Sequence, residues 1–146
     1  MKIYTIGVDL GGTNIKAGLV DEAHHKTNLP RPEHEVEAEI AALCSQLAQR
    51  AGLDMAAQIE SVGIGTPGSV NPHTGVVEFN ANFGYRNWPL VSAMEKLLPC
   101  RVYIENDANA AAYGEYIAGA AQGAKYAIAV TLGTGIGGGI IIDGKI

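Results

Sequence analysis

The chain has 146 residues, 47% of them apolar, and a formal net charge of −5, which allows one compact domain with its own core. The negative charge argues weakly against a nucleic-acid partner, because phosphate backbones reward clustered Lys and Arg and this sequence has no such cluster, so we expect none. The apolar run at the start is interrupted by Asp9 and is too short for a signal peptide. No stretch is long enough to span a bilayer, so we expect a cytoplasmic protein without a membrane partner.

The first predicted elements are two strands joined by a glycine turn. Residues 3–8 form a β-rich run that ends at Gly11-Gly12, and residues 14–20 form a second such run. This order predicts a hairpin rather than a strand that enters a helix.

Residues 33–51 change to a helical pattern, with apolar side chains at three- and four-residue intervals along one face. Gly52 follows as the expected C′ residue. The remaining elements in chain order are strands at 60–65 and 76–79, a helix at 89–98, a strand at 101–105, a helix from Asn106-Asp107 to about residue 120, and two strands around a tight loop in residues 126–146. This mixture, with 19 glycines, is typical of a tightly turned α/β protein.

The two cysteines, Cys44 and Cys100, stand among apolar neighbours and have no CxxC spacing. Two buried thiols in a reducing compartment is the favoured interpretation. A disulfide between them is the alternative that the sequence leaves open.

Two glycine-threonine turns between strands, at Gly11–Thr13 and Gly133–Gly135, are the most informative motifs. Glycine leaves backbone N–H groups uncovered, and several that point one way form an anion-binding nest. In the first turn Asp9 is a candidate Mg²⁺ ligand, acting through water because Mg²⁺ keeps much of its hydration, and Lys16 is a candidate cation near a transferred phosphoryl group. Each turn alone is more typical of an ordinary hairpin, but two at opposite ends of the chain favour a phosphate clamp.

The second turn also matches a dinucleotide-binding fingerprint, because Gly133, Gly135 and Gly138 fit GxGxxG. That motif works only where a helix follows and its N-terminus meets the pyrophosphate. Residues 140–142 continue as a strand, so this interpretation is rejected. A Walker-type GxxxxGK[ST] is absent from the sequence as well.

Asp107 lies where a strand passes into a helix. Asn and Asp are preferred N-cap residues, so the spacing alone favours a cap. The alternative is a general base for a sugar hydroxyl, since a helix N-terminus stabilises the ionised carboxylate. Its low basicity is tolerable if the hydroxyl loses its proton late, as a loose phosphoryl-transfer transition state permits.

Asparagines near Asp107 or in a polar run suit a sugar, because amides both donate and accept hydrogen bonds. Asn106 adjoins Asp107, and Asn80 and Asn82 stand in a run too polar for a core strand. Trp88, in the same run, either stacks on a sugar face or anchors the following helix, which is the more common role.

A glycine-rich turn in the middle of the chain is less informative. Gly65, Pro67 and Gly68 either bring backbone close to a ligand or end a strand.

Four segments carry a resemblance to a known family: GVDLGGTNIKAGLV, VGIGTPGSV, IENDANAAAYGE and TLGTGIGGGIIIDGKI. Together they cover most of the chain, and they resemble the ROK family of sugar kinases and repressors, within the actin-like ATPase and hexokinase superfamily. The resemblance is strongest to the bacterial glucokinases of this family. It implies a ribonuclease-H-like α/β lobe, with a mixed sheet opened by a hairpin and helices packed on it.

The resemblance implies transfer of the ATP γ-phosphate to the 6-hydroxyl of a hexose, expected to be glucose, with Mg²⁺. Asp107 matches the family's catalytic base and would be cap and base together. Asn82, Asn106 and Gly65 match residues at the sugar. The residues implied at ATP phosphates are Asp9, Gly11, Gly12, Thr13, Asn14, Lys16, Gly133, Thr134, Gly135 and Gly137, with Asp9 also at Mg²⁺.

The chain departs from the family in two respects. Family kinases are roughly twice as long, and their later segment holds a Glu and His of the sugar site, a Cys/His zinc motif and the adenosine pocket. Four scattered histidines and two lone cysteines cannot replace that zinc site. The family also has a strand between its second strand and first helix, whereas residues 21–32 are short and polar, so we expect that strand to be deleted or dropped from the sequence.

These expectations divide the chain into an N-terminal kinase lobe, residues 1–121, and the start of a second lobe, residues 122–146. The closing hairpin would then lack a sheet to join, and its edges would favour a homodimer. With half of the clamp, this chain alone is expected to have little or no kinase activity.

Several alternatives stay open. N-acetylglucosamine, N-acetylmannosamine and fructose are other possible substrates. A sugar-responsive repressor of the same family is the non-enzymatic alternative, although such proteins carry a DNA-binding helix-turn-helix before the first phosphate loop, and this chain starts at that loop's own strand. A fragment made by truncation or proteolysis is the third.

Overall fold

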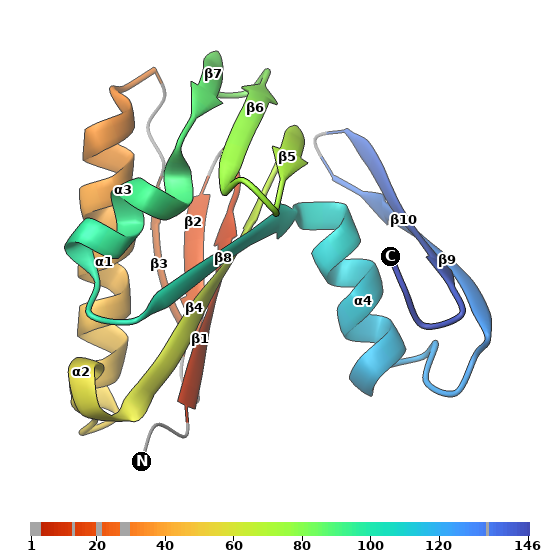
Figure 1. The fold of residues 1–146 in the computed structure, drawn as a ribbon, viewed down its shortest axis with the longest axis horizontal. Coiled ribbons are helices and arrows are strands. Elements are labelled where there is room, and N and C mark those ends of the chain that lie inside the picture. The colour runs from red at the N-terminus through yellow and green to blue at the C-terminus, as the bar shows by residue number, and fades with distance from the viewer. Residues whose placement is uncertain (1–3, 13, 20–21, 27–29, 134) are drawn as a thin grey trace. The chain divides into compact units, whose positions relative to one another are not determined.

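The computed structural model describes residues 4–12, 14–19, 22–26, 30–133 and 135–146 (Figure 1). It divides into two compact units, Met1–Glu105 and Asn106–Ile146. The boundary expected near residue 122 concerns the lobes of a longer enzyme and stays a prediction.

A five-stranded mixed sheet organises the first unit, in the order β3-β2-β1-β4-β8. Strand β1 pairs antiparallel with β2 and parallel with β4, so the predicted opening hairpin is confirmed. The strand bounds are β1 Tyr4–Leu10, β2 Asn14–Gly18, β3 Glu22–Lys26, β4 Ile59–Thr66 and β8 Arg101–Asn106.

Strand β3 occupies the segment where we expected a strand to be missing. It pairs antiparallel with β2, from Asn14 opposite Lys26 to Gly18 opposite Glu22, and it lies at the edge of the sheet. The expectation of a deletion was wrong because an edge strand needs a backbone partner on one side only. A polar sequence such as Glu-Ala-His-His-Lys is therefore compatible with it.

Helix α1, Glu33–Arg50, packs against β2 and β3 and against α3, Leu90–Leu97 (Figure 1). The predicted helical face is buried, and it meets the apolar side chains of β1, β2 and β4 in one core. Gly52 follows the helix at φ +67°, and its N–H donates to the carbonyl of Gln49 at 3.0 Å, which confirms the C′ prediction.

A second, three-stranded sheet and a short helix complete the first unit. Strands β5 (Ser69–Asn71), β6 (Val76–Asn80) and β7 (Tyr85–Trp88) pair antiparallel in sequence order, and α2 (Met55–Gln58) precedes β4. The sequence predicted only β6 of these strands. Trp88 is fully buried and its indole N–H donates to Glu37 Oε1 at 2.7 Å, so it is an anchor and does not stack on a sugar.

The second unit is a helix packed on a hairpin: α4 (Asp107–Ala118) lies on β9 (Tyr126–Leu132) and β10 (Ile136–Ile142) (Figure 1). Small residues permit the close approach. A Cβ at Gly139 would lie 2.5 Å from the Cβ of Ala112, and one at Gly137 would lie 2.8 Å from the Cβ of Ala108. The small side chains of Ala108 and Ala112 therefore allow the helix to pack closely on the closing hairpin.

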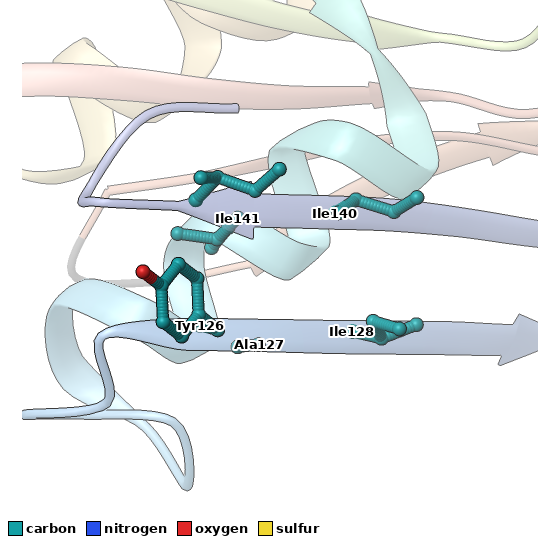
Figure 2. A pocket seen from close by; sticks show the side chains of 6 residues that line it. Tyr126, Ala127, Ile128, Ile140 and Ile141 are labelled. Carbon is teal, nitrogen blue, oxygen red and sulfur yellow. The ribbon is translucent and has the colours of Figure 1, made fainter.

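The opposite face of this hairpin is apolar and exposed, and we call it the hairpin face. Its large side chains, between 56% and 82% exposed, are Tyr126, Ile128, Val130, Leu132, Ile136, Ile140 and Ile142. A hollow of about 280 Å³ lies near the strand ends. Figure 2 shows side chains of both strands that line it, among them Ile128 and Ile140. Its apolar lining offers a sugar no hydrogen-bonding side chain beyond the hydroxyl of Tyr126.

Among the described helices, none is long and apolar enough to cross a membrane.

Both cysteines are buried and free, so the favoured interpretation of two buried thiols is confirmed. Burial raises the pKa of Cys44 from 9.0 to about 12, and nearby Cys100 adds to the rise. The unfolded chain therefore loses this proton from about pH 9, and the folded chain keeps it until about pH 12. The free energy of unfolding should be unaffected by this group below pH 9 and should fall as the pH rises from 9 towards 12.

Urea unfolding at pH 8 and pH 10 measures that fall, with Cys44→Ala as the matched control. The alanine variant cannot titrate at this position, so its free energy of unfolding should change less between the two pH values. An equal change in both proteins would contradict the assignment. Folded wild-type protein should also react slowly with a thiol reagent at pH 8, because the thiolate is the reactive form.

Candidate functional site

The predicted phosphate-binding residues that the structure describes in the first unit lie on β1, on β2 and in the turn between them, beside the carboxyl end of β4. Asp9, near the end of β1, is the register partner of Gly65 on β4 and of Lys16 on β2. Asp9 and Lys16 are both exposed. Because cross-strand partners project to the same face, one carboxylate and one ammonium group share this end of the sheet.

The first glycine turn is closed by its own backbone. The N–H of Gly11 donates to the carbonyl of Asn14 at 2.9 Å, and a Cβ at Gly11 would lie 3.0 Å from that same oxygen. A side chain there would push the turn open. Thr13, the remaining residue of this turn, lies outside the described residues.

The turn meets a predicted sugar residue. A Cβ at Gly12 would lie 3.2 Å from Nδ2 and 3.3 Å from Cβ of Asn82, so the glycine backbone passes directly beside that side chain. Asn82 is exposed, and its amide is available to a ligand. The structure thus places a predicted phosphate loop and a predicted sugar residue next to each other, although 70 positions of sequence separate them.

Asn80 has a different role from the one considered for it. Its side chain is fully buried, and its Oδ1 accepts hydrogen bonds from the backbone N–H of Asn82 at 3.0 Å and of Phe83 at 3.3 Å. Its Nδ2 lies 3.4 Å from Thr66 Oγ1 and donates to it. A buried amide engaged in this way holds the loop and does not contact a sugar.

The structure at the start of helix α4 bears on the cap role considered for Asp107, and it leaves the role of general base as a prediction. Asn106 is the N-cap, since its Oδ1 accepts from the N–H of Ala108 at 3.0 Å and of Asn109 at 3.1 Å. Asp107 is the first helical residue and is half-buried, with Oδ1 2.8 Å from the N–H of Ala108. The expectation that Asp107 is itself the cap was wrong, because the neighbouring asparagine takes that position.

The second glycine turn joins β9 to β10 as predicted, and β10 continues as a strand where a dinucleotide site needs a helix. The N–H of Gly133 donates to the carbonyl of Gly135 at 2.9 Å, and a Cβ on either glycine would meet no atom within 4 Å. Gly137 differs, because its missing side chain makes room for Ala108. Thr134 lies outside the described residues.

The predicted site residues therefore fall into two groups. The first unit brings together Asp9, Gly12, Lys16, Gly65 and Asn82, and the second unit holds Asn106, Asp107 and the second glycine turn. In the described part of the chain, no three His, Cys, Asp or Glu side chains are grouped to hold a metal ion.

Sequence reasoning missed Thr66 as part of this site. It is fully buried, and only its place directly before Pro67-Gly68 hinted at a role. A buried hydroxyl needs a partner, and the amide of Asn80 is that partner here.

Comparisons with known proteins give one consistent result. Residues 5–146 match the model of the ROK family. A glucokinase of Streptomyces coelicolor is 44% identical over 148 residues, which are 97% of this chain and 44% of the relative. An N-acetyl-D-glucosamine kinase of Histophilus somni is 34% identical over 143 residues, covering 96% and 46% of the two chains.

A solved structure agrees closely in fold. It is a ROK family glucokinase from Streptomyces griseus in complex with glucose and AMPPNP, with a TM-score of 0.86 and 41% identity, covering 98% of this chain and 46% of that one. The chain spans about half the length of the curated relatives it matches.

Proposed function

Because this chain belongs to the ROK family, we propose that it acts as the N-terminal half of an ATP-dependent hexose kinase that phosphorylates the 6-hydroxyl of glucose. The observation that carries the proposal is the close approach of the first glycine turn to Asn82, because these are the backbone predicted to bind phosphate and the amide predicted to bind the sugar. Identity to the Streptomyces coelicolor glucokinase supports glucose as the substrate.

The fold agrees with this family. The mixed sheet, opened by a hairpin and covered by helices, is the ribonuclease-H-like fold of the actin and hexokinase superfamily, as in the structural neighbours. The closing hairpin, by the same proposal, belongs to the second lobe of the longer enzyme.

Asp107 is the proposed general base. Its carboxylate accepts the proton of the 6-hydroxyl as that oxygen bonds to the γ-phosphorus of ATP, the bond from the γ-phosphorus to the bridging oxygen breaks, and ADP leaves. The carboxylate lies at the head of α4, with Oδ1 2.8 Å from the N–H of Ala108. Asn82, Asn106 and Gly65 orient the sugar.

The two glycine turns are the proposed phosphate-binding elements, with Lys16 as a cation for the transferred group. Mg²⁺ fits at Asp9, because an exposed carboxylate stands beside Gly7 and Gly63, around which a Cβ would meet nothing within 4 Å. That space suits an ion that keeps its waters. When bound, the ion neutralises charge on the phosphate oxygens.

N-acetylglucosamine is the second candidate substrate, favoured by the identity to the Histophilus somni kinase. The experiment that decides is a panel of hexoses with the full-length gene product, measuring kcat/KM by coupled ADP release. Glucose should give the highest value. A higher value for N-acetylglucosamine would replace glucose, and no ADP release with any hexose would overturn the kinase proposal.

The 146-residue chain by itself should show little or no turnover in the same assay, because it supplies only part of the groups that position the substrates. Near-normal turnover with glucose would contradict this. We place the working enzyme in the cytoplasm.

We further propose that this chain by itself forms a homodimer, because the hairpin face leaves seven large apolar side chains exposed. Light scattering at high concentration should give twice the chain mass. Ile140→Lys should return a monomer, since it puts a charge within this apolar face. Leu97→Lys is the matched control and should stay dimeric, because Leu97 is also an exposed apolar residue, 48% against 58% for Ile140, but lies on α3 in the other unit. A wild-type monomer would refute the dimer.

A further inference from the structure

Asn80 is one of two polar residues that are fully buried in the described part of the chain, and the other is its partner Thr66. Its described hydrogen bonds all join it to the turn that follows β6 or to the end of β4. Its side-chain oxygen accepts from the N–H groups of Asn82 and Phe83, its amide nitrogen donates to Thr66, and its carbonyl accepts from the N–H of Gly84 at 2.8 Å.

These bonds hold a four-residue turn, residues 81–84, against the end of β4. The segment after β4 also lies close to the end of β6, because a Cβ at Gly68 would lie 2.2 Å from the carbonyl oxygen of Phe79 and 3.0 Å from Cα of Asn80. The turn presents Asn82 to Gly12. The segments that follow β1, β4 and β6 therefore meet, and Asn80 joins two of them.

We propose that Asn80 is the positioning residue that holds the amide of Asn82 beside the first glycine turn and thereby sets the affinity for the sugar. This inference rests on the proposed hexose kinase function. Asn80 acts through Asn82, since its own side chain is buried and engaged within the protein.

Loss of the Asn80 side chain would remove the acceptor for two backbone N–H groups and one of the two partners of the Thr66 hydroxyl, which would keep its bond to the carbonyl of Pro67. Buried polar groups without partners are costly, so the turn would shift until water reaches them. Small displacements of a residue that orients a substrate reduce its contribution strongly. The sugar-binding amide would then be present but misplaced.

The test uses the full-length enzyme and a double-mutant cycle. Asn80→Ala should raise the KM for glucose about tenfold, the loss expected for a buried hydrogen-bonded group, while kcat changes by less than about threefold. Asn82→Ala should raise the KM by a similar factor. In the double variant Asn80→Ala should add almost nothing, because the residue through which it acts is gone.

Two further variants separate positioning from a general structural role. Asn80→Asp keeps an oxygen that accepts from both N–H groups, so it should recover most of the glucose affinity. Thr66→Val removes two long 3.4 Å bonds, one from Asn80 Nδ2 and one to the carbonyl of Pro67. It leaves both bonds to the turn in place, so its effect on KM should be smaller than that of Asn80→Ala. Amide hydrogen exchange at Asn82 and Phe83 should accelerate in Asn80→Ala and stay slow in Asn80→Asp.

The outcomes are distinct. If the effects of Asn80→Ala and Asn82→Ala on KM multiply fully in the double variant, Asn80 does not act through Asn82 and the inference is wrong. If Asn80→Ala fails to fold, a glucose KM in Asn80→Asp as poor as in Asn82→Ala overturns it as well. A wild-type enzyme that phosphorylates no hexose would refute the kinase proposal instead, and the exchange rates would still report whether Asn80 holds the turn.

Discussion

Replacing Asp107 with asparagine in the full-length enzyme should lower turnover by about 10²- to 10⁴-fold, the range that a positioned general base contributes. Asparagine has nearly the same shape but cannot take the proton of the sugar hydroxyl. The KM for glucose should stay within about threefold of the wild-type value, because the substitution removes an interaction that matters in the transition state. Steady-state kinetics with a coupled ADP-release assay measure both constants.

The neighbouring residue provides the matched control. Asn106 caps α4 with its side-chain oxygen, so Asn106→Ala should lower the free energy of unfolding by about 1 kcal/mol, whereas Asp107→Asn should leave it almost unchanged. If Asp107→Asn weakens glucose binding as much as it lowers turnover, Asp107 has a structural role and is not the base.

Replacing Gly68 with alanine should lower the free energy of unfolding by about 2–4 kcal/mol, through a strained backbone and a steric clash together. Gly68 has φ +104°, which side chains rarely adopt, and a Cβ there would lie 2.2 Å from the carbonyl oxygen of Phe79. That oxygen belongs to the backbone of β6, so it cannot rotate away. Urea unfolding measures the loss.

Gly52→Ala is the comparison that separates the two causes. Gly52 also has a positive φ, +67°, but a Cβ there would meet nothing within 4 Å. Its replacement should cost about 1 kcal/mol, from the backbone alone. Equal losses at both positions would show that β6 moves to accept the new side chain and that the contact at Gly68 is soft.

The long elements were predictable from the sequence because their burial is periodic. Helix α1 repeats its apolar residues at helical spacing, and β1, β2 and β4 are short apolar runs bounded by glycine turns. Strands β3, β5 and β7 were not predictable, since an edge strand or a three-residue strand such as Ser69–Asn71 is fixed by its partner and not by its own composition.

The sequence identified candidate site residues, but it did not predict which of them lie next to one another in the structure. The glycine turns and Asp107 could be named because each motif is local in the sequence. The contact between Gly12 and Asn82 could not be foreseen, since the two residues lie far apart in the chain and meet through the sheet. The sequence could not decide whether Asn106 or Asp107 caps α4, and the structure shows that Asn106 does. A difference of one residue is the usual uncertainty of a helix boundary.

The close packing of α4 on the closing hairpin bears on how this protein can be recombined with its relatives. Ala108 and Ala112 fit Gly137 and Gly139 with no room for a methyl group, so the four positions form a single module. A chimera joined between α4 and β9 would combine a helix from one relative with a hairpin from another. One larger residue at any of these positions would then force the two apart. A crossover just before Asn106 would transfer the helix, its cap and the hairpin as one inherited block.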